Sequence, residues 1–223
     1  MNRMNATDLL GSSIRAADGD ASTVSDILFD DKSLAIRWVV VRTGSWLSEE
    51  QVLVVPQNLI RSEADPRIWE TRLTNDDFKK APPLEDDLPV SLQRLREAKV
   101  GSGVSPFRIA PLGIPPVVRL QSAQAGDHHL RSTCHLTGYD ILVDSVKVGQ
   151  VADFVVALPG WTISALVFHD DDQETRAQNL ERPLRIDADR GVVDLSKVTN
   201  RTSPLHDQSG SESARAGRRP FGH

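Results

Sequence analysis

The sequence predicts an all-β protein with a few short helices, built as two tandem copies of one small β-barrel unit. The first observation behind this prediction is an internal duplication. The second is a series of short β-branched and aromatic runs separated by turn residues, which is typical of a small sheet or barrel. The third is a stretch rich in proline and glycine that divides the 223 residues into two parts.

The duplication aligns residues 9–41 with residues 136–168 at a constant offset of 127 residues and without a gap. Seven positions are identical in the two copies: Leu9, Gly11, Ile14, Val24, Asp26, Ile36 and Val40 match Leu136, Gly138, Ile141, Val151, Asp153, Ile163 and Val167. Most of these positions are apolar, and the two glycines are interpreted as backbone positions. The duplication therefore predicts a common fold and leaves the function nearly open.

Four strands are expected in the first copy. Residues 22–29 and 34–42 are joined by the turn Asp30-Asp31-Lys32-Ser33, which predicts a hairpin. A third strand at 51–55 ends at a proline, because proline has no amide hydrogen to donate to a ladder. Alternating large side chains predict the fourth at 67–73.

Two short helices follow these strands. Thr74 with Asp77 three residues later has the spacing of a helix N-terminus, and Pro82-Pro83 should end that helix soon. Leu92 and Leu95 share one face of a second helix, expected at 91–98.

The composition divides the chain into four parts, namely a first domain at 8–98, a linker at 99–130, a shorter second domain at 131–199 and a tail at 200–223. The second domain should contain strands near Ile141, at 149–157 and at 161–169, and a last hairpin around Asp189-Arg190-Gly191. The tail has few large apolar residues, so burial cannot offset the entropy of ordering it, and we expect it to be disordered.

Charge and composition favour a soluble cytoplasmic protein. The formal net charge of −5 argues against a dedicated nucleic-acid surface, so nucleic-acid binding is not expected. The single cysteine, Cys134, cannot form an intramolecular disulfide. No apolar run approaches the ~20 residues that a membrane-spanning helix needs, and the N-terminus lacks the apolar core of a signal peptide.

Several segments of the first copy resemble the PRC-barrel domain, a small β-barrel named for the cytoplasmic part of the photosynthetic reaction centre H subunit and also found in ribosome maturation factors. The resemblance rests on Leu10-Gly11, Ala17-Asp18-Gly19, residues 24–31, residues 36–41, residues 43–47 and residues 52–56. It covers residues 8–98 and continues on fewer positions over 131–197. Ser145-Val146 and the acidic segment 170–174 depart from the pattern.

The resemblance implies an all-β fold and a non-catalytic role, because recognised members of the family act through protein contacts. We therefore expect a protein-binding or scaffold module that associates with itself, with no cofactor and no catalytic residue. Two alternatives stay open. One is a component of electron or proton transfer similar to the reaction centre H subunit, and the other is an accessory protein of RNA processing or ribosome assembly.

Three groups of residues have side chains suited to metal binding or acid chemistry, but we predict no functional site at any of them. His128, His129, Cys134 and His135 have zinc or copper ligand atoms, but they lie at the exit of the predicted linker, and no metal site is predicted. Asp170-Asp171-Asp172 lacks the glycine-spaced loop that calcium favours, so we interpret it as a solvated loop. Asp26 and Asp153 lie in separate domains, and we expect each to bond backbone at a turn or strand entry.

The candidate partner-binding residues are Trp38, Trp46, Leu47 and Val52. Strict alternation places Ile36, Trp38 and Val40 on one face of a strand and Arg37, Val39 and Val41 on the other, so both faces carry large apolar groups. One barrel interior covers only one face, which predicts a homo-oligomer. Trp46 lies in a Gly-Ser turn and is the stronger contact candidate, because exposed tryptophan is enriched at binding hot spots.

Overall fold

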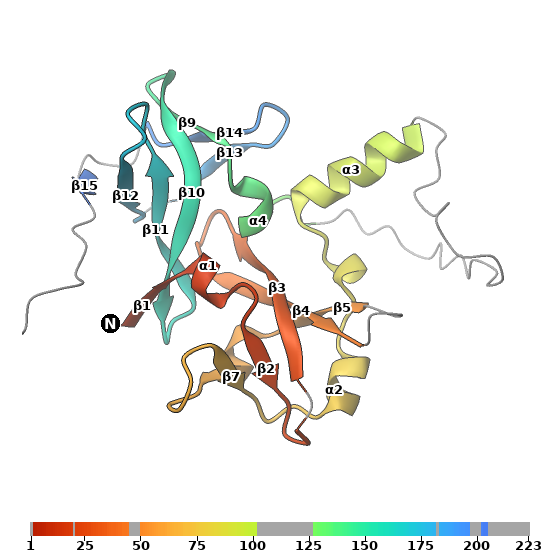
Figure 1. Ribbon diagram of the computed structural model, residues 1–223. Helices are drawn as coiled ribbons and strands as arrows, with labels where there is room; N and C mark the ends of the chain where they lie inside the picture. The colour runs from red at the N-terminus through yellow and green to blue at the C-terminus, as the bar shows by residue number, and fades with distance from the viewer. Residues whose placement is uncertain are drawn as a thin grey trace, which may run out of the picture.

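Two β-sheets with a few short helices make up the computed structural model, which describes residues 2–19, 21–44, 50–101, 127–181, 183–196 and 202–204 (Figure 1). The first copy supplies most of a seven-stranded sheet and the second most of an eight-stranded sheet. The all-β prediction with short helices is confirmed. The sheets are open, however, because the hydrogen-bonded order ends at β5 and β6 in one and at β13 and β15 in the other.

The elements of the first copy are β1 (Asn2–Asn5), α1 (Ala6–Leu9), β2 (Ser13–Arg15), β3 (Ala21–Asp30), β4 (Ile36–Thr43), β5 (Glu50–Val54), η1 (Pro56–Asn58), β6 (Ile60–Arg61), β7 (Ile68–Glu70), α2 (Asn75–Lys80), η2 (Leu84–Asp86) and α3 (Val90–Gly101). Thr74 is the N-cap of α2, as predicted, and a capping box forms there: the Thr74 hydroxyl accepts the Asp77 amide and the Asp77 carboxylate accepts the Thr74 amide. Helix α3 extends away from both sheets (Figure 1).

The elements of the second copy are β8 (Leu130–Ser132), α4 (Thr133–Leu136), β9 (Asp140–Val143), β10 (Val146–Leu158), β11 (Thr162–His169), β12 (Thr175–Asn179), β13 (Arg185–Asp187), β14 (Val192–Asp194) and β15 (Thr202–Pro204). Strand β15 pairs with β12, so residues 202–204 of the predicted tail form a strand. In both copies the strand after the short helix also pairs in parallel with a later strand of the unit, β2 with β7 and β9 with β14.

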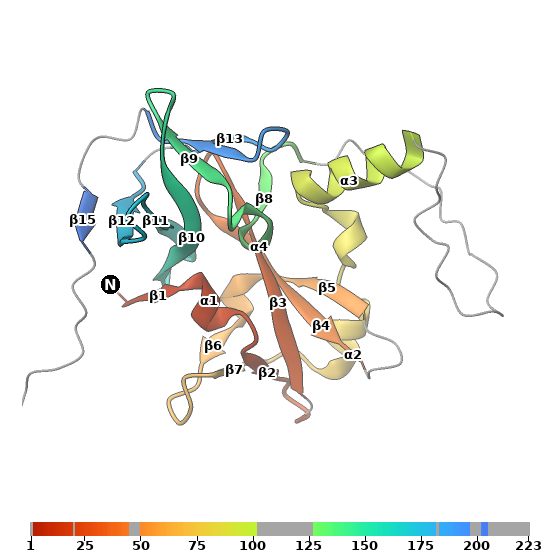
Figure 2. The ribbon, with the colours of Figure 1, turned by 45° about the horizontal axis from the view of Figure 1, so that its top comes forward.

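The copies exchange their first strands, which the sequence analysis does not predict. Strand β1 pairs with β10 of the second copy, with Met4 opposite Val156, and β8 pairs with β3 of the first copy, with Arg131 opposite Phe29 (Figure 2). At the offset of 127 residues, Arg131 is the equivalent of Met4 and Val156 is the equivalent of Phe29, so the two pairings are the same with the copies exchanged. The chain is therefore a pseudo-symmetric pair of units, each completed by a strand from the other.

Two β-bulges recur in both copies. Ser25 and Arg37 are the unpaired extra residues of the β3–β4 ladder, and Ala152 and Ser164, 127 residues later, are those of the β10–β11 ladder. A bulge reverses the side-chain alternation beyond it. The predicted grouping of Ile36 with Trp38 is therefore wrong: Ile36 lies in the main core with Val39 and Val41.

One main core runs through both copies. Phe29 and Phe154 meet at a ring-centroid distance of 5.5 Å, and Trp69 and Trp161 at 5.4 Å. A smaller cluster lies on the outer face of the first sheet, where Trp38, Leu88 and Leu92 pack against Leu28, Val40, Leu53, Leu84 and Leu130. The face from which the sequence argument derives a homo-oligomer is thus covered by this chain's own residues.

Candidate protein-binding site

The duplicated aspartates connect the two copies. Asp153 accepts hydrogen bonds from the amide and the hydroxyl of Thr7, at 3.2 and 2.5 Å, at the start of the first copy's α1. Asp26 accepts the Ser132 hydroxyl at 2.6 Å and the Cys134 amide at 3.3 Å in the second copy. Each carboxylate also binds the next backbone amide of its own strand at 2.7 Å. These residues therefore hold the exchanged segments in place.

The two repeated glycines are backbone positions, as the sequence predicts. Gly11 has φ of 75° and Gly138 has φ of 86°, a region that other residues rarely adopt. Each amide donates to the carbonyl of the residue before the bulge, Val24 for Gly11 and Val151 for Gly138. The glycines thus form the turn between the short helix and the next strand.

Trp38 packs within the chain. Its side chain is half-buried in the outer cluster, and its Nε1 donates to Asp87 Oδ2 at 2.7 Å. Asp87 also binds Arg37, which forms a second ion pair with Asp127. Trp38 therefore holds the segment before α3 against β4, and its role in binding a partner stays a prediction.

The four candidate metal ligands separate in the structure. His129 Nδ1 lies 2.9 Å from Asp31 Oδ1, while His135 Nδ1 bonds the Ser91 hydroxyl at 2.7 Å. The Cys134 thiol donates to the Ser25 carbonyl, and desolvation together with the Asp26 carboxylate raises the pKa of Cys134 to about 12. In the part of the chain that the structure describes, no group of three or more histidine, cysteine or acidic side chains is placed to hold a metal ion.

The acidic segment of the second copy forms the turn between β11 and β12. Asp170 accepts Arg176 Nε at 2.6 Å and the amides of Asp172 and Glu174. Burial acts to raise the pKa of Asp170, but the Glu174 amide and the Arg176 guanidinium together hold it below its ordinary value. Asp170 is therefore a structural residue of the turn.

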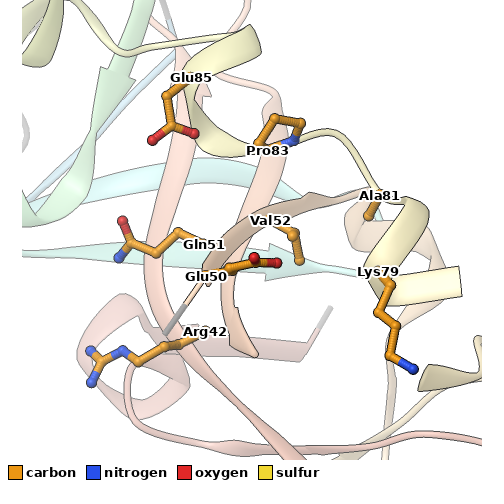
Figure 3. A pocket seen from close by; sticks show the side chains of 8 residues that line it. All are labelled: Arg42, Glu50, Gln51, Val52, Lys79, Ala81, Pro83 and Glu85. Carbon is orange, nitrogen blue, oxygen red and sulfur yellow. The ribbon is translucent and has the colours of Figure 1, made fainter. Parts of the chain in front are cut away.

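An open groove of about 740 Å³ lies beside the β4–β5 hairpin of the first copy. Residues of the hairpin and of the segment from α2 to η2 line it, namely Arg42, Glu50, Gln51, Val52, Lys79, Ala81, Pro83 and Glu85 (Figure 3). Figure 3 shows Arg42 and Lys79 on opposite sides, with the Glu50 carboxylate between them. Charges of both signs suit a polar partner segment better than an apolar small molecule.

The groove exposes part of the outer edge of β5. Leu53 donates its amide to the Pro82 carbonyl at 2.8 Å, and Val52 forms an isolated bridge with Pro83. Because alternate residues of a strand direct their amides to the same edge, the Gln51 amide points the same way as the Leu53 amide. Among the described residues, the Gln51 amide donates no backbone hydrogen bond to this covering segment.

The sequence candidates lie at this groove only in part. Val52 lines it, although Val52 is 4% exposed and belongs to the main core. Trp46 and Leu47 lie outside the described residues, four and three positions before Glu50 in the chain. The sequence pattern at Pro82-Pro83 predicted only a helix end, so Lys79, Pro83 and Glu85 were not predicted to line a groove.

Residues 1–66 match the family model of the PRC-barrel domain. This part of the chain is therefore similar to a PRC-barrel domain. The match confirms the resemblance drawn from the sequence over residues 8–66 and ends before β7. No curated protein matches the chain. Among the described residues, no helix has the length and apolar character required to cross a membrane.

The groove lies at the boundary of the matched PRC-barrel domain. Arg42, Glu50, Gln51 and Val52 belong to the PRC-barrel match, whereas the opposite wall comes from residues 79–85, beyond it. The site therefore combines a strand edge of the region that matches the PRC-barrel model with a wall added by the segment that follows.

Proposed function

We propose that this protein is a non-catalytic binding module and that its partner is a protein segment that docks in the groove of the PRC-barrel domain. The observation that carries the proposal is the edge of β5 inside the groove, where the Gln51 amide points outward. A partner strand can add to such an edge, with affinity from main-chain hydrogen bonds and specificity from side-chain contacts.

The side chains around this edge support a protein partner. Arg42 and Lys79 offer positive charges and Glu50 and Glu85 negative ones, which allows a complementary polar segment to be oriented. Trp46 precedes β5 and adds a large side chain of the kind enriched at binding hot spots. The sequence prediction of a contact at Trp46 and Leu47 is thus part of the proposal.

Self-association is the narrower form of the prediction. Its argument from the outer face of β4 no longer holds, because residues of the outer cluster cover that face. It now rests on Trp46 and Leu47 alone. Light scattering of the wild type and Trp46→Ala at micromolar concentration tests it, and a wild type that stays monomeric contradicts it.

A pair of substitutions at one position tests the proposed edge. Affinity capture from the native cell first identifies a partner, and calorimetry then measures its affinity for the wild type, Gln51→Pro and Gln51→Ala. Gln51→Pro removes the outward amide, whereas Gln51→Ala retains it. We expect Gln51→Pro to weaken binding about tenfold, as the loss of one hydrogen bond implies, with Gln51→Ala near the wild type.

Circular dichroism and thermal unfolding check that both variants remain folded, since proline is tolerated on an edge strand where its nitrogen faces outward. If the folded Gln51→Pro variant binds the partner as tightly as Gln51→Ala does, the partner does not pair with β5 and the proposal is wrong.

A further inference from the structure

The two copies close the end of the core beside their equivalent strands, β5 and β12, differently. In the first copy Phe78 of α2 is 2% exposed and belongs to the main core together with Val52 and Val54 of β5. These two valines pair with Val41 and Val39 of β4. An aromatic side chain from the segment after the last strand thus plugs this end.

The second copy has polar residues at the same strand positions. Arg176 and Gln178 of β12 pair with Phe168 and Leu166, the equivalents of Val41 and Val39 at the offset of 127. After β14 the described residues 195–196 and 202–204 contain no helix equivalent to α2. The aromatic plug of the first copy has no counterpart among these residues.

A hollow of about 430 Å³ lies at this end of the second copy. Its apolar lining comes from Val143, Val148, Phe168 and Leu195, and its polar lining from Lys147, Asp170, Asp171, Asp172, Arg176 and Gln178. Gln178 is 6% exposed, so this polar group lies deep in the wall. The hollow therefore combines an apolar floor with a charged rim.

The rim has an excess of negative charge. Arg176 pairs with Asp170 and Glu174, and Lys147 pairs with Asp140 at 2.7 Å, so both cations are already neutralised. Among the described residues, the carboxylates of Asp171 and Asp172 have no hydrogen bond or ion pair. The lining suits an aromatic or aliphatic group that lies next to a positive charge.

The chain itself carries such a group in the segment that follows β15 in sequence. Strand β15 ends at Pro204, which lies opposite Arg176 on the rim. Residues 205–223 follow, and they include Arg218-Arg219-Pro220-Phe221. The root-mean-square span of an unstructured chain from Pro204 to Phe221 is about 20–25 Å, so the hollow is within its reach.

We propose that the C-terminal segment Arg218-Arg219-Pro220-Phe221 docks in the hollow of the second copy. Phe221 fills the place that Phe78 fills in the first copy, and the arginines face Asp171 and Asp172. Tethering beside the site gives the segment an effective concentration in the millimolar range, about the level found for short linkers. A ligand from another molecule must displace this segment before it can bind.

Hydrogen exchange of the full chain tests the docking. The amides of residues 168–178 should exchange about tenfold faster in Phe221→Ala than in the wild type, because the docked segment shields the hollow. Phe107→Ala, which removes a phenylalanine from the predicted linker, is the matched control and should leave these rates unchanged. Equal rates in the wild type and Phe221→Ala overturn the proposal.

A peptide of residues 214–223 with a fluorescent label gives a second measurement. It should bind the Phe221→Ala chain, bind the wild type about tenfold more weakly because the site is occupied, and fail to bind when Asp171→Lys and Asp172→Lys are added. If the peptide fails to bind the Phe221→Ala chain, the proposal is overturned. It is also overturned if the hydrogen-exchange protection of the wild type rises with protein concentration, because the tail of a second copy then occupies the hollow. Gln51→Pro should change neither result, so this proposal and the β5 proposal fail separately.

Discussion

Asp153→Ala is predicted to destabilise the whole chain, because this carboxylate holds the exchanged β1–α1 segment. The side chain is 9% exposed and accepts the amide and hydroxyl of Thr7 and the amide of Phe154. A hydrogen bond to a charged group contributes about 1.5–3 kcal/mol, but the three bonds share one acceptor and are not additive. We expect a loss of about 3–5 kcal/mol, large against the usual 5–15 kcal/mol of a folded protein.

Urea denaturation followed by circular dichroism measures this loss. Thr7→Val removes only the hydroxyl, and a double-mutant cycle with Asp153→Ala should give a coupling energy of about 1–2 kcal/mol. Asp171→Ala, an exposed aspartate of the same copy, should cost less than about 0.5 kcal/mol. A loss below about 1 kcal/mol for Asp153→Ala, or no coupling with Thr7→Val, would refute the reasoning.

Three further predictions concern the core, acid stability and the thiol. Phe78→Ala should cost about 3–5 kcal/mol, because it empties a fully buried site; calorimetry showing an unchanged melting temperature would contradict this. The hydrogen bond from the His129 amide and, after it, the Arg37 guanidinium outweigh the effect of burial and hold the pKa of Asp127 below its ordinary value of 3.8. The stability that the ionised Asp127 contributes is therefore present above pH 3.8 and is lost as the pH falls through the lowered pKa. Denaturation at a series of acidic pH values should therefore show a shallower loss of stability in Asp127→Asn than in the wild type, and identical slopes would disagree. With a pKa of about 12, the Cys134 thiol should react with a disulfide reagent about a thousandfold more slowly than a peptide thiol at pH 8, and an equal rate would contradict the assigned environment.

Local patterns allowed most strands to be predicted. The turn at Asp30–Ser33 and the β-branched runs on either side correspond to β3 and β4, and the Thr74–Asp77 spacing corresponds to the capping box of α2. Such features depend on residues near one another in sequence. The duplication extended the same assignments to β10 and β11.

The exchange between copies could not be read from the sequence. Strand β1 consists of Asn-Arg-Met-Asn, which has no apolar alternation, and β8 begins at the end of the predicted linker. The aspartates at 26 and 153 were placed at equivalent positions, and their backbone bonds were expected. Their cross-copy partners depend on the strand exchange, which no local pattern encodes.

The candidate sites depend on differences between the copies that only the register reveals. The bulges at Arg37 and Ser164 shift the alternation, so a period of two misplaced Ile36. The strand register places Arg176 and Gln178 at the positions of Val52 and Val54, and this equivalence shows that polar residues replace apolar ones there. The β5 groove, likewise, needs the return of residues 79–85 to the strand edge, a contact between distant segments.

The reciprocal strand exchange makes the two units thermodynamically inseparable. Neither sheet keeps its full set of strands when the other unfolds, since each loses a donated strand and the helix that follows it. The molecule should therefore melt as one cooperative unit, although its sequence reads as two domains. A ligand that binds only the folded state at one copy then stabilises both through linkage, so occupancy at one end of the molecule is felt at the other without any change of shape.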